Sequence, residues 1–338
     1  MIRVISNSNY FIEGYNQLPK IIIFNEIHKE ALRFLKKQEG LEIVIVGEQE
    51  RNRLLSNLID ADAIILRYLP FDNECFKVSK NLKVISRHGV GYDNVDMDSA
   101  NKFCIPVTTI GNENAVTVAE LTMYFILSSA KQGPMHDKAV RTNNWKIRDN
   151  ADAIELAGKN VLILGFGRIG SRVAKRIKSF ETNVYVYDPY ISQELITNAG
   201  CIPVSNWQDI IPDIDILTIH VPLNKETEFM INETVINKIK PGSILVNTAR
   251  GAIVDTESVS QGLLSGKFFG IGFDVFNKEP PNADDPIIKS ERSILTPHVG
   301  GLTKECSIRS SMRASQNAID GINGKLDEKY VVNIEVFE

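Results

Sequence analysis

Short apolar runs alternate with helical stretches along most of the chain. In the first third, the runs that predict strands are 21–26, 41–46, 62–67, 82–87 and 105–110. A second series follows at 160–165, 183–188, 215–221, 243–249, 270–276 and 293–298. Strands that alternate with helices are typical of a parallel sheet with helices on both faces. The pattern therefore predicts an α/β protein with two such units written one after the other.

Two longer helical stretches, roughly 115–131 and 303–323, separate the units. The second stretch follows the last predicted strand, so the chain after it can return to the first domain. We expect residues 1–114 and 303–338 to form one discontinuous domain and residues 115–302 to form the other. Both are expected to be Rossmann-like or flavodoxin-like parallel-sheet domains with a cleft between them. A length of 338 residues agrees with two domains.

Composition excludes several classes of protein. The chain is 43% hydrophobic and 24% charged with a net charge of −4, which gives no basic field for nucleic acid or an anionic membrane. The first 20 residues contain no long apolar core and do not resemble a secretory signal. The most apolar helical stretch, 115–130, contains Glu120 and is short for a membrane span. These features predict a cytoplasmic protein with no nucleic-acid or membrane partner.

The four cysteines are widely spaced and form no CxxC pair. No histidine pattern beside them is typical of zinc, so no metal site is expected. We expect all four to be buried, reduced thiols; they are Cys75, Cys104, Cys201 and Cys306.

A glycine-rich turn, GFGRIG, joins the run 160–164 to a helical stretch that starts near Arg168. Gly165 and Gly167 would permit a tight turn and a close backbone approach to a pyrophosphate, with Ile169 and Gly170 leading into the helix. The helix N-terminus would then point its free N–H groups at the phosphates. The alternative is a tight connection between strand and helix with no ligand.

An acid follows the turn at the expected distance. Asp188 ends the next strand, 188 − 170 = 18 residues after the last glycine, near the spacing of about 20 typical of the acid that binds the ribose hydroxyls. An aspartate there would repel a 2′-phosphate, which favours NAD over NADP. The alternative is a loop aspartate that caps the next helix.

Three polar residues stand at the ends of later strand-like runs: Arg250, Glu279 and His298. Reduction of a 2-oxo acid needs a cation for the carboxylate and ketone, a proton donor for the developing alkoxide, and a hydride. Arg250 suits the first role and His298 the second. A bond from Glu279 would orient the imidazole and raise its pKa. Each residue alone could be an ordinary surface or loop residue.

The motifs together resemble one family, the D-isomer-specific 2-hydroxyacid dehydrogenases. The resemblance extends over nearly the whole chain from about residue 21, and its motifs occur in the family's order. They are RHGVGYDNVD (87–96), NAVTVAE (114–120), GFGRIG (165–170), HVPLNKET (220–227), KPGSILVNTARG (240–251), FDVFNKEP (273–280) and TPHVGG (296–301). The family places its catalytic arginine, glutamate and histidine at Arg250, Glu279 and His298.

The resemblance implies further contacts residue by residue. It implies that Asp274 bonds the nicotinamide carboxamide and that the backbone of Val90 and Gly91 meets the substrate carboxylate. A homodimer is the family expectation. Other residues expected to line the cofactor are Thr117, His220, Val221, Pro222, Thr248 and Ala249.

Two arginines bear on the substrate. Arg67 and Arg87 end neighbouring predicted strands and should emerge at the same edge of the sheet. A second anionic group on the substrate, such as a phosphate, would explain both. Their positions resemble those of arginines in the D-3-phosphoglycerate dehydrogenase-like branch. The alternative is that they pair with acids such as Asp72 or Asp93.

The first hypothesis is therefore an NAD-dependent dehydrogenase that interconverts 3-phosphoglycerate and 3-phosphohydroxypyruvate in serine biosynthesis. Residues 1–114 with 303–338 would be its substrate-binding, catalytic domain and 115–302 its NAD-binding Rossmann domain. Because the chain ends at Glu338, no added regulatory domain is expected. Alternatives on the same fold are a hydroxypyruvate or glyoxylate reductase and a D-lactate dehydrogenase, while Glu279 argues against formate dehydrogenase, which has glutamine there. The alternative from another class is an NAD(H)-sensing corepressor.

Overall fold

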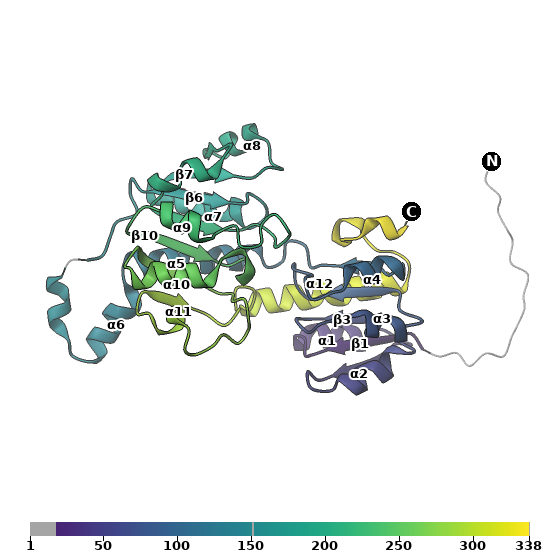
Figure 1. Cartoon of the computed structure of the whole chain (residues 1–338). Helices are drawn as coiled ribbons and strands as arrows, with labels where there is room; N and C mark the ends of the chain where they lie inside the picture. The colour runs from purple at the N-terminus through teal and green to yellow at the C-terminus, as the bar shows by residue number, and fades with distance from the viewer. Residues whose placement is uncertain (1–17, 151, 338) are drawn as a thin grey trace, which may run out of the picture. The chain divides into compact units, whose positions relative to one another are not determined.

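The computed structural model describes residues 18–150 and 152–337 and divides into two compact units; Figure 1 labels many of their helices and some of their strands. The first unit contains the described residues of 1–88, 94–108 and 314–338, and the second contains those of 89–93 and 109–313. The later boundary falls inside helix α12 (Lys304–Ile322) rather than before it, where we predict a domain limit. Compactness alone does not test which unit binds substrate, so the domain assignment stays a prediction.

Residues 1–17, which make up most of the segment in which we expect no secretory signal, lie outside the described part. Within 18–150 and 152–337, no helix combines the length and the apolar character that a membrane span requires.

The first unit contains a five-stranded parallel sheet in the order β2-β1-β3-β4-β5, which is the flavodoxin-like order. All five predicted strands are present, although each predicted range extends beyond the observed strand at one end or at both. The strands are β1 (Lys20–Phe24), β2 (Glu42–Val46), β3 (Ala63–Leu66), β4 (Val84–Arg87) and β5 (Val107–Thr108).

The second unit contains a seven-stranded parallel sheet in the order β12-β11-β10-β9-β6-β7-β8, in which β6, the first strand of the unit, lies between β9 and β7, the order of a Rossmann fold. Six strands lie within or beside the predicted runs. The seventh, β8, is a two-residue edge strand that the sequence did not predict because it is too short to show periodicity. The strands are β6 (Asn160–Leu164), β7 (Asn183–Tyr187), β8 (Ile202–Pro203), β9 (Ile216–Ile219), β10 (Ser243–Asn247), β11 (Phe268–Phe273) and β12 (Ser293–Leu295).

Helices connect the strands in both units. Two of them, α5 (Ala115–Ala130) and α12, agree with the predicted long helices to within one residue at each end. The other α-helices are α1 (Lys29–Lys36), α2 (Arg51–Leu58), α3 (Asn73–Val78), α4 (Met97–Lys102), α6 (Gly133–Arg141), α7 (Gly170–Ile177), α8 (Gln193–Asn198), α9 (Glu233–Lys238), α10 (Thr256–Leu264) and α11 (Pro286–Lys289). Short 3-10 helices span Trp145–Asp149, Lys178–Phe180, Trp207–Asp209, Ile211–Asp213, Gly251–Ile253, Glu328–Tyr330 and Ile334–Phe337.

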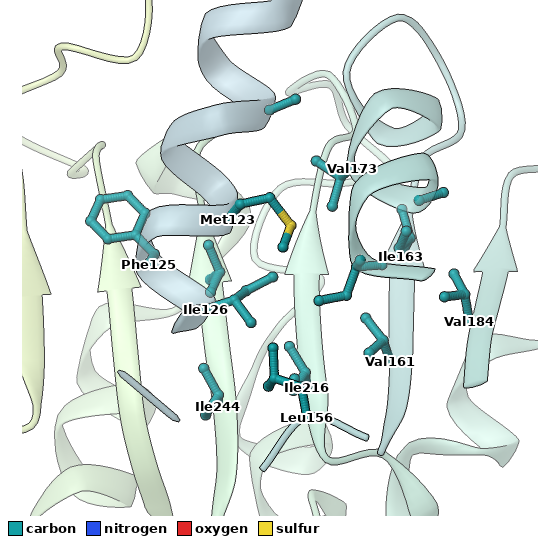
Figure 2. Close-up of a cluster of buried hydrophobic side chains, with 14 of the residues drawn as sticks. Met123, Phe125, Ile126, Leu156, Val161, Ile163, Val173, Val184, Ile216 and Ile244 are labelled. Atoms are coloured by element: carbon teal, nitrogen blue, oxygen red, sulfur yellow. The ribbon is translucent and has the colours of Figure 1, made fainter. Parts of the chain in front are cut away.

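The sheet of the second unit has a hydrophobic layer on each face. Val161 and Ile163 of β6 belong to one layer, and the alternate residues Leu162 and Leu164 belong to the other, as the pleat requires. Figure 2 shows the first layer, in which Met123, Phe125 and Ile126 of α5 lie over the sheet beside Val161 and Ile163. Burial of one such aliphatic or aromatic side chain contributes about 1.5–3 kcal/mol. Packing on this sheet therefore accounts for the strongly apolar character of α5.

The cysteines partly follow expectation. All four are free, and Cys75, Cys201 and Cys306 are buried. Cys104 is exposed, contrary to the prediction, because it lies in the turn after α4 with a φ of 53° rather than in a regular element. Burial raises the pKa of Cys75 to about 11 and also raises that of Cys201, so neither is a ready thiolate.

Candidate active site

The glycine-rich turn lies between β6 and α7. Gly165 has a φ of 92°, and a Cβ there would lie 2.7 Å from the carbonyl oxygen of His220. A Cβ at Gly170 would lie 1.9 Å from the carbonyl oxygen of Gly165. A Cβ at Gly167, by contrast, would meet no atom within 4 Å. The first and last glycines are therefore required by the protein's own backbone, whereas the middle one leaves space that a bound group can use. Helix α7 begins at Gly170, slightly later than the predicted start near Arg168.

Asp188 lies directly against this turn. Its Oδ2 accepts a hydrogen bond of 2.7 Å from the backbone N–H of Phe166, and its Oδ1 accepts one of 2.9 Å from Tyr190. The next helix, α8, is capped by Ser192 instead. The alternative of a helix-capping aspartate is therefore wrong, while the predicted role of Asp188 as a ribose ligand stays a prediction.

The segment after β9 packs against the same turn through the carbonyl of His220 and the N–H of Val221. The Nε2 atom of His220 lies 2.9 Å from the hydroxyl of Thr218, while its Nδ1 is buried with no partner among the described residues. Burial lowers the pKa of His220 to about 3, so the ring is neutral at physiological pH. A buried nitrogen without a partner is costly unless a ligand satisfies it, which fits a polar cofactor here.

The remaining residues expected to line the cofactor also belong to the second unit. Thr248 is buried, and its hydroxyl lies 3.1 Å from that of Thr122. The hydroxyl of buried Thr117 lies 3.4 Å from that of Thr303. Arg168 donates to the carbonyl of Gly111 at 3.2 Å. These hydrogen bonds do not contradict the predicted contacts with the cofactor, which stay predictions. The contacts predicted for Ile169, Pro222 and Ala249 also stay predictions.

Glu279 and His298 meet as the sequence predicts. The Oε2 atom of Glu279 lies 2.8 Å from Nδ1 of His298, and Oε1 accepts a bond of 3.0 Å from the N–H of Phe276. Burial would raise the pKa of Glu279, but the bonds from His298 and Phe276 together hold it below its usual value. The carboxylate is thus ionised at neutral pH and can only accept, so Nδ1 carries the hydrogen. The Nε2 atom has no hydrogen-bond partner among the described residues.

Asp274 holds the loop that carries His298. Its carboxylate accepts three hydrogen bonds of 2.6 to 2.8 Å, from the hydroxyl of Thr296 and the N–H groups of Val299 and Gly300. Its carbonyl accepts the N–H of His298 at 2.8 Å. Burial raises the pKa of Asp274 more than these bonds lower it. Sequence reasoning assigned Asp274 a cofactor contact and missed this loop-holding arrangement, since the partners lie more than 20 residues away.

A pocket of about 400 Å³ opens beside the pair. Glu279 and His298 line it together with mostly apolar side chains, including Phe276, Pro281 and Leu295.

Arg250 follows β10 and lies against the loop 89–93. Its Nε donates to Oδ1 of Asp93 at 2.9 Å, and its Nη1 donates to the carbonyl of Ala249 at 2.7 Å. Gly91 is so close that a Cβ there would lie 1.3 Å from Nη2. The structure therefore brings together Arg250 and Gly91, which were predicted separately, while sequence reasoning did not assign Asp93 to Arg250. In the sequence, the only indication of this contact was that Asp93 belongs to the GYDN segment of the motif 87–96, which also contains Gly91.

Arg67 and Arg87 belong to the first unit. Leu66 pairs with Arg87 across β3 and β4, so both arginines stand at the same edge of the sheet, as predicted. Arg67 donates to the carbonyl of Glu26 at 3.0 Å, and Arg87 donates to Oδ1 of Asn94 at 2.9 Å. Burial, and then the charges of both arginines, lower the pKa of His88 to about 4.

Each of the two acids considered as alternative partners also forms an ion pair with another arginine. Asp72 forms an ion pair of 2.7 Å with Arg51, and Asp93 forms the one with Arg250. Within the described ranges, no group of three His, Cys, Asp or Glu side chains is placed to hold a metal ion.

Comparisons with known proteins identify a family that the chain matches. Residues 123–300 match the family model described as "D-isomer specific 2-hydroxyacid dehydrogenase, NAD binding domain". The chain is 33% identical over 320 residues to D-3-phosphoglycerate dehydrogenase of Archaeoglobus fulgidus, covering 94% of this chain and 60% of that protein. It is 34% identical over 328 residues to glyoxylate reductase of Thermofilum pendens, covering 95% of this chain and 96% of that protein.

A solved structure shows the same fold. The D-lactate dehydrogenase of Aquifex aeolicus, complexed with NAD and lactic acid, matches with a TM-score of 0.81 and 29% identity, covering 92% of this chain and 98% of that one. The chain spans about 60% of the length of the Archaeoglobus relative, while it matches nearly the full length of the Thermofilum one.

Proposed function

Because the chain belongs to the D-isomer specific 2-hydroxyacid dehydrogenase family, we propose that it interconverts a 2-hydroxy acid and a 2-oxo acid with NAD. The observation that carries the proposal is the bond between Glu279 and His298, which leaves Nε2 of the imidazole as the atom that exchanges a proton. A histidine so held is suited to general acid and base catalysis.

In the direction of reduction, His298 gives the proton on Nε2 to the carbonyl oxygen of the substrate as that oxygen becomes an alkoxide. The ionised Glu279 keeps Nδ1 protonated and stabilises the positive charge of the imidazolium beforehand. In the reverse direction the neutral imidazole takes the alcohol proton. NADH, when bound, supplies the hydride that the carbonyl carbon receives.

Arg250 binds the substrate carboxylate and polarises the ketone. A guanidinium is planar and permanently charged, so it can hold two oxygens in one geometry. The attraction between the guanidinium and the ketone oxygen becomes stronger as that oxygen becomes an alkoxide. Arg250 therefore stabilises the transition state more than the ground state.

The second unit, which contains the matched NAD-binding segment, supplies the proposed NAD ligands. The turn from Gly165 to Gly170 and the N-terminus of α7 would hold the pyrophosphate, and Asp188 would bond the ribose hydroxyls. The open space at Gly167 and the unsatisfied Nδ1 of His220 support this placement. Thr117, Val221, Pro222, Thr248, Ala249 and Asp274 complete the proposed lining.

For the substrate, we propose 3-phosphohydroxypyruvate and 3-phosphoglycerate, which would place the enzyme in serine biosynthesis. Arg67 and Arg87 would bind the phosphate, and the backbone of Val90 and Gly91 would meet the carboxylate. The resemblance to D-3-phosphoglycerate dehydrogenases supports this choice. The glyoxylate reductase relative keeps glyoxylate or hydroxypyruvate as the second candidate. We further propose that the protein acts as a cytoplasmic homodimer.

The test is oxidation of NADH by the purified protein, with kcat/KM compared for 3-phosphohydroxypyruvate, hydroxypyruvate, glyoxylate and pyruvate. A preference of tenfold or more for the phosphorylated ketone, about 1.4 kcal/mol of discrimination, is expected. Equal or better use of the smaller ketones would contradict the phosphate proposal. NADH binding without turnover of any of the four would contradict the enzymatic proposal and favour a sensing corepressor.

Replacement of the arginines tests the phosphate proposal directly. Arg67→Ala should raise KM for the phosphorylated ketone by about tenfold because a charged hydrogen bond is lost, and should leave KM for glyoxylate nearly unchanged. Lys77→Ala, which removes a positive charge from α3 in the same unit, is the matched control. An equal change in KM for both substrates in Arg67→Ala would mean that the arginine has a structural role and does not bind the phosphate.

A further inference from the structure

We infer that Asp93 is a positioning residue for Arg250, and that it turns the guanidinium so that Nη2 is left to bind the substrate carboxylate. The inference rests on the role proposed above for Arg250. It goes beyond that role because it names what sets the orientation of the arginine side chain.

The backbone of Arg250 is fixed independently of Asp93. Asn247 is fully buried, and its side-chain amide donates to the carbonyl of Arg250 at 2.9 Å. Its Oδ1 accepts the N–H of Ala249 at 3.0 Å. The side chain of Arg250 nevertheless retains several rotatable bonds, so a fixed backbone does not determine where its guanidinium points.

Two of the three guanidinium nitrogens are bound by the protein. Nε donates to Asp93 and Nη1 donates to the carbonyl of Ala249. Nη2 has no hydrogen-bond partner among the described residues, so its two N–H groups are the donors that remain. Because Ala249 is the adjoining residue, its carbonyl turns with the arginine backbone. Asp93 is distant in sequence and defines the orientation from outside.

The absence of a side chain at Gly91 leaves room for the guanidinium of Arg250 in this orientation. A Cβ at Gly91 would lie 1.3 Å from Nη2 and 2.6 Å from Cζ of Arg250, and also 2.8 Å from Oδ1 of Asp93. Any side chain there would displace the guanidinium or break its bond to Asp93. The loop thus supplies both an acceptor for Nε and a surface without a side chain on which Nη2 rests.

A simple stabilising ion pair is the competing explanation. The side chain of Asp93 is 53% exposed and that of Arg250 is 25% exposed, and ion pairs this open to water add little to stability. If Asp93 positions Arg250, its loss should weaken binding of the substrate carboxylate. It should change the free energy of unfolding little.

The first variants are Asp93→Ala, which removes the acceptor, and Asp93→Asn, which keeps an oxygen for Nε. Asp93→Ala should raise KM for the 2-oxo acid at least tenfold with a smaller change in kcat and an unchanged Kd for NADH. Asp93→Asn should recover most of the loss. Asp137→Ala, which removes an exposed Asp–Arg pair of 2.7 Å on α6, is the matched control and should leave KM unchanged. An unchanged KM in Asp93→Ala would overturn the inference.

A double-mutant cycle separates positioning from other effects. Lysine lacks Nε and the planar fork, so in an Arg250→Lys background Asp93→Ala should change kcat/KM less than twofold. The same loss in both backgrounds would mean that Asp93 acts elsewhere. Gly91→Ala should reproduce the high KM of Asp93→Ala while NADH binding persists.

Binding of oxalate, a non-reacting mimic of the 2-oxo acid, distinguishes failure of the inference from failure of the proposed function. Titration of oxalate into the NADH-loaded protein should give a Kd at least tenfold higher for Asp93→Ala than for the wild type. Equal Kd values would overturn the inference alone. Absence of both oxalate binding and turnover in the wild type would overturn the inference together with the proposed function.

Discussion

The two parallel sheets begin alike and end differently. In the first, Asp62 precedes β3, and its Oδ2 accepts the N–H of Lys20 at the start of β1 at 2.9 Å. In the second, Asp215 precedes β9, and its Oδ2 accepts the N–H of Asn160 at the start of β6, also at 2.9 Å. Each aspartate further binds a lysine, Lys83 or Lys240, through Oδ1. Both units thus start their central strands with the same polar arrangement.

The two sheets differ at the carboxyl ends of their strands, where the connections to the following helices have different sequences. After β1 the chain passes through Asn25 to α1, which is capped by the side chain of His28. After β6 it passes through GFGRIG to α7, and Gly167 leaves open space. The comparison teaches that a parallel sheet and a following helix are a shared scaffold. We propose that only the connection that replaces side chains with glycine lets a dinucleotide approach its backbone N–H groups.

The largest effect should come from the site of the second unit. His298→Ala should lower kcat by about 10³-fold because it removes the proton donor, while the Kd for NADH stays nearly constant. Single-turnover kinetics and NADH fluorescence measure the two quantities. Loss of cofactor binding would show that His298 serves the scaffold instead.

The glycine turn gives the next largest effect. Gly167→Val should leave the unfolding free energy nearly unchanged but raise the Kd for NADH by about 100-fold, about 2.7 kcal/mol, because its side chain fills the open space. Gly165→Ala should instead destabilise the fold by roughly 1–3 kcal/mol, since its φ is positive and the new Cβ meets His220. Equal unfolding free energies of the two variants in urea would contradict the claim that Gly165 is required by the fold and Gly167 by the cofactor.

The shared aspartates should behave alike. Asp62→Ala and Asp215→Ala each leave a backbone N–H without its acceptor and should cost about 1–3 kcal/mol of stability, with kcat/KM unchanged. Urea unfolding and steady-state kinetics check this. A loss of activity at native stability in either variant would mean that the two starting edges are not equivalent.

The smallest effect concerns Glu279 and pH. Its pKa in the folded protein lies below the usual 4.5, so its ionised form stabilises the fold above that value, and the contribution disappears as the pH falls through the lower folded pKa. Because the side chain is 39% exposed, the wild type should exceed Glu279→Gln by about 0.5 kcal/mol at pH 7. Unfolding at pH 7 and at pH 3 measures the difference. A difference that does not shrink as the pH is lowered from 7 to 3 would contradict the ionic origin.

Local pattern was enough for much of the molecule. The predicted strands 160–165 and 183–188 contain β6 and β7, and the Glu279–His298 pair forms as expected. Periodicity of apolar residues and glycine placement are properties of short segments, so they can be read before the chain folds. The same reasoning failed for β8 and for Cys104, whose short edge strand and irregular turn carry no periodic signal.

By itself, the sequence determined the two parallel-sheet units, the glycine turn with Asp188, and the identity of Arg250, Glu279 and His298 as candidates. Only the tertiary structure decided that Asp93, 157 residues before Arg250, holds its guanidinium, and that Asp274 holds the loop of His298. Such contacts join segments far apart along the chain. They depend on how strands are ordered in space, and no local spacing encodes that order.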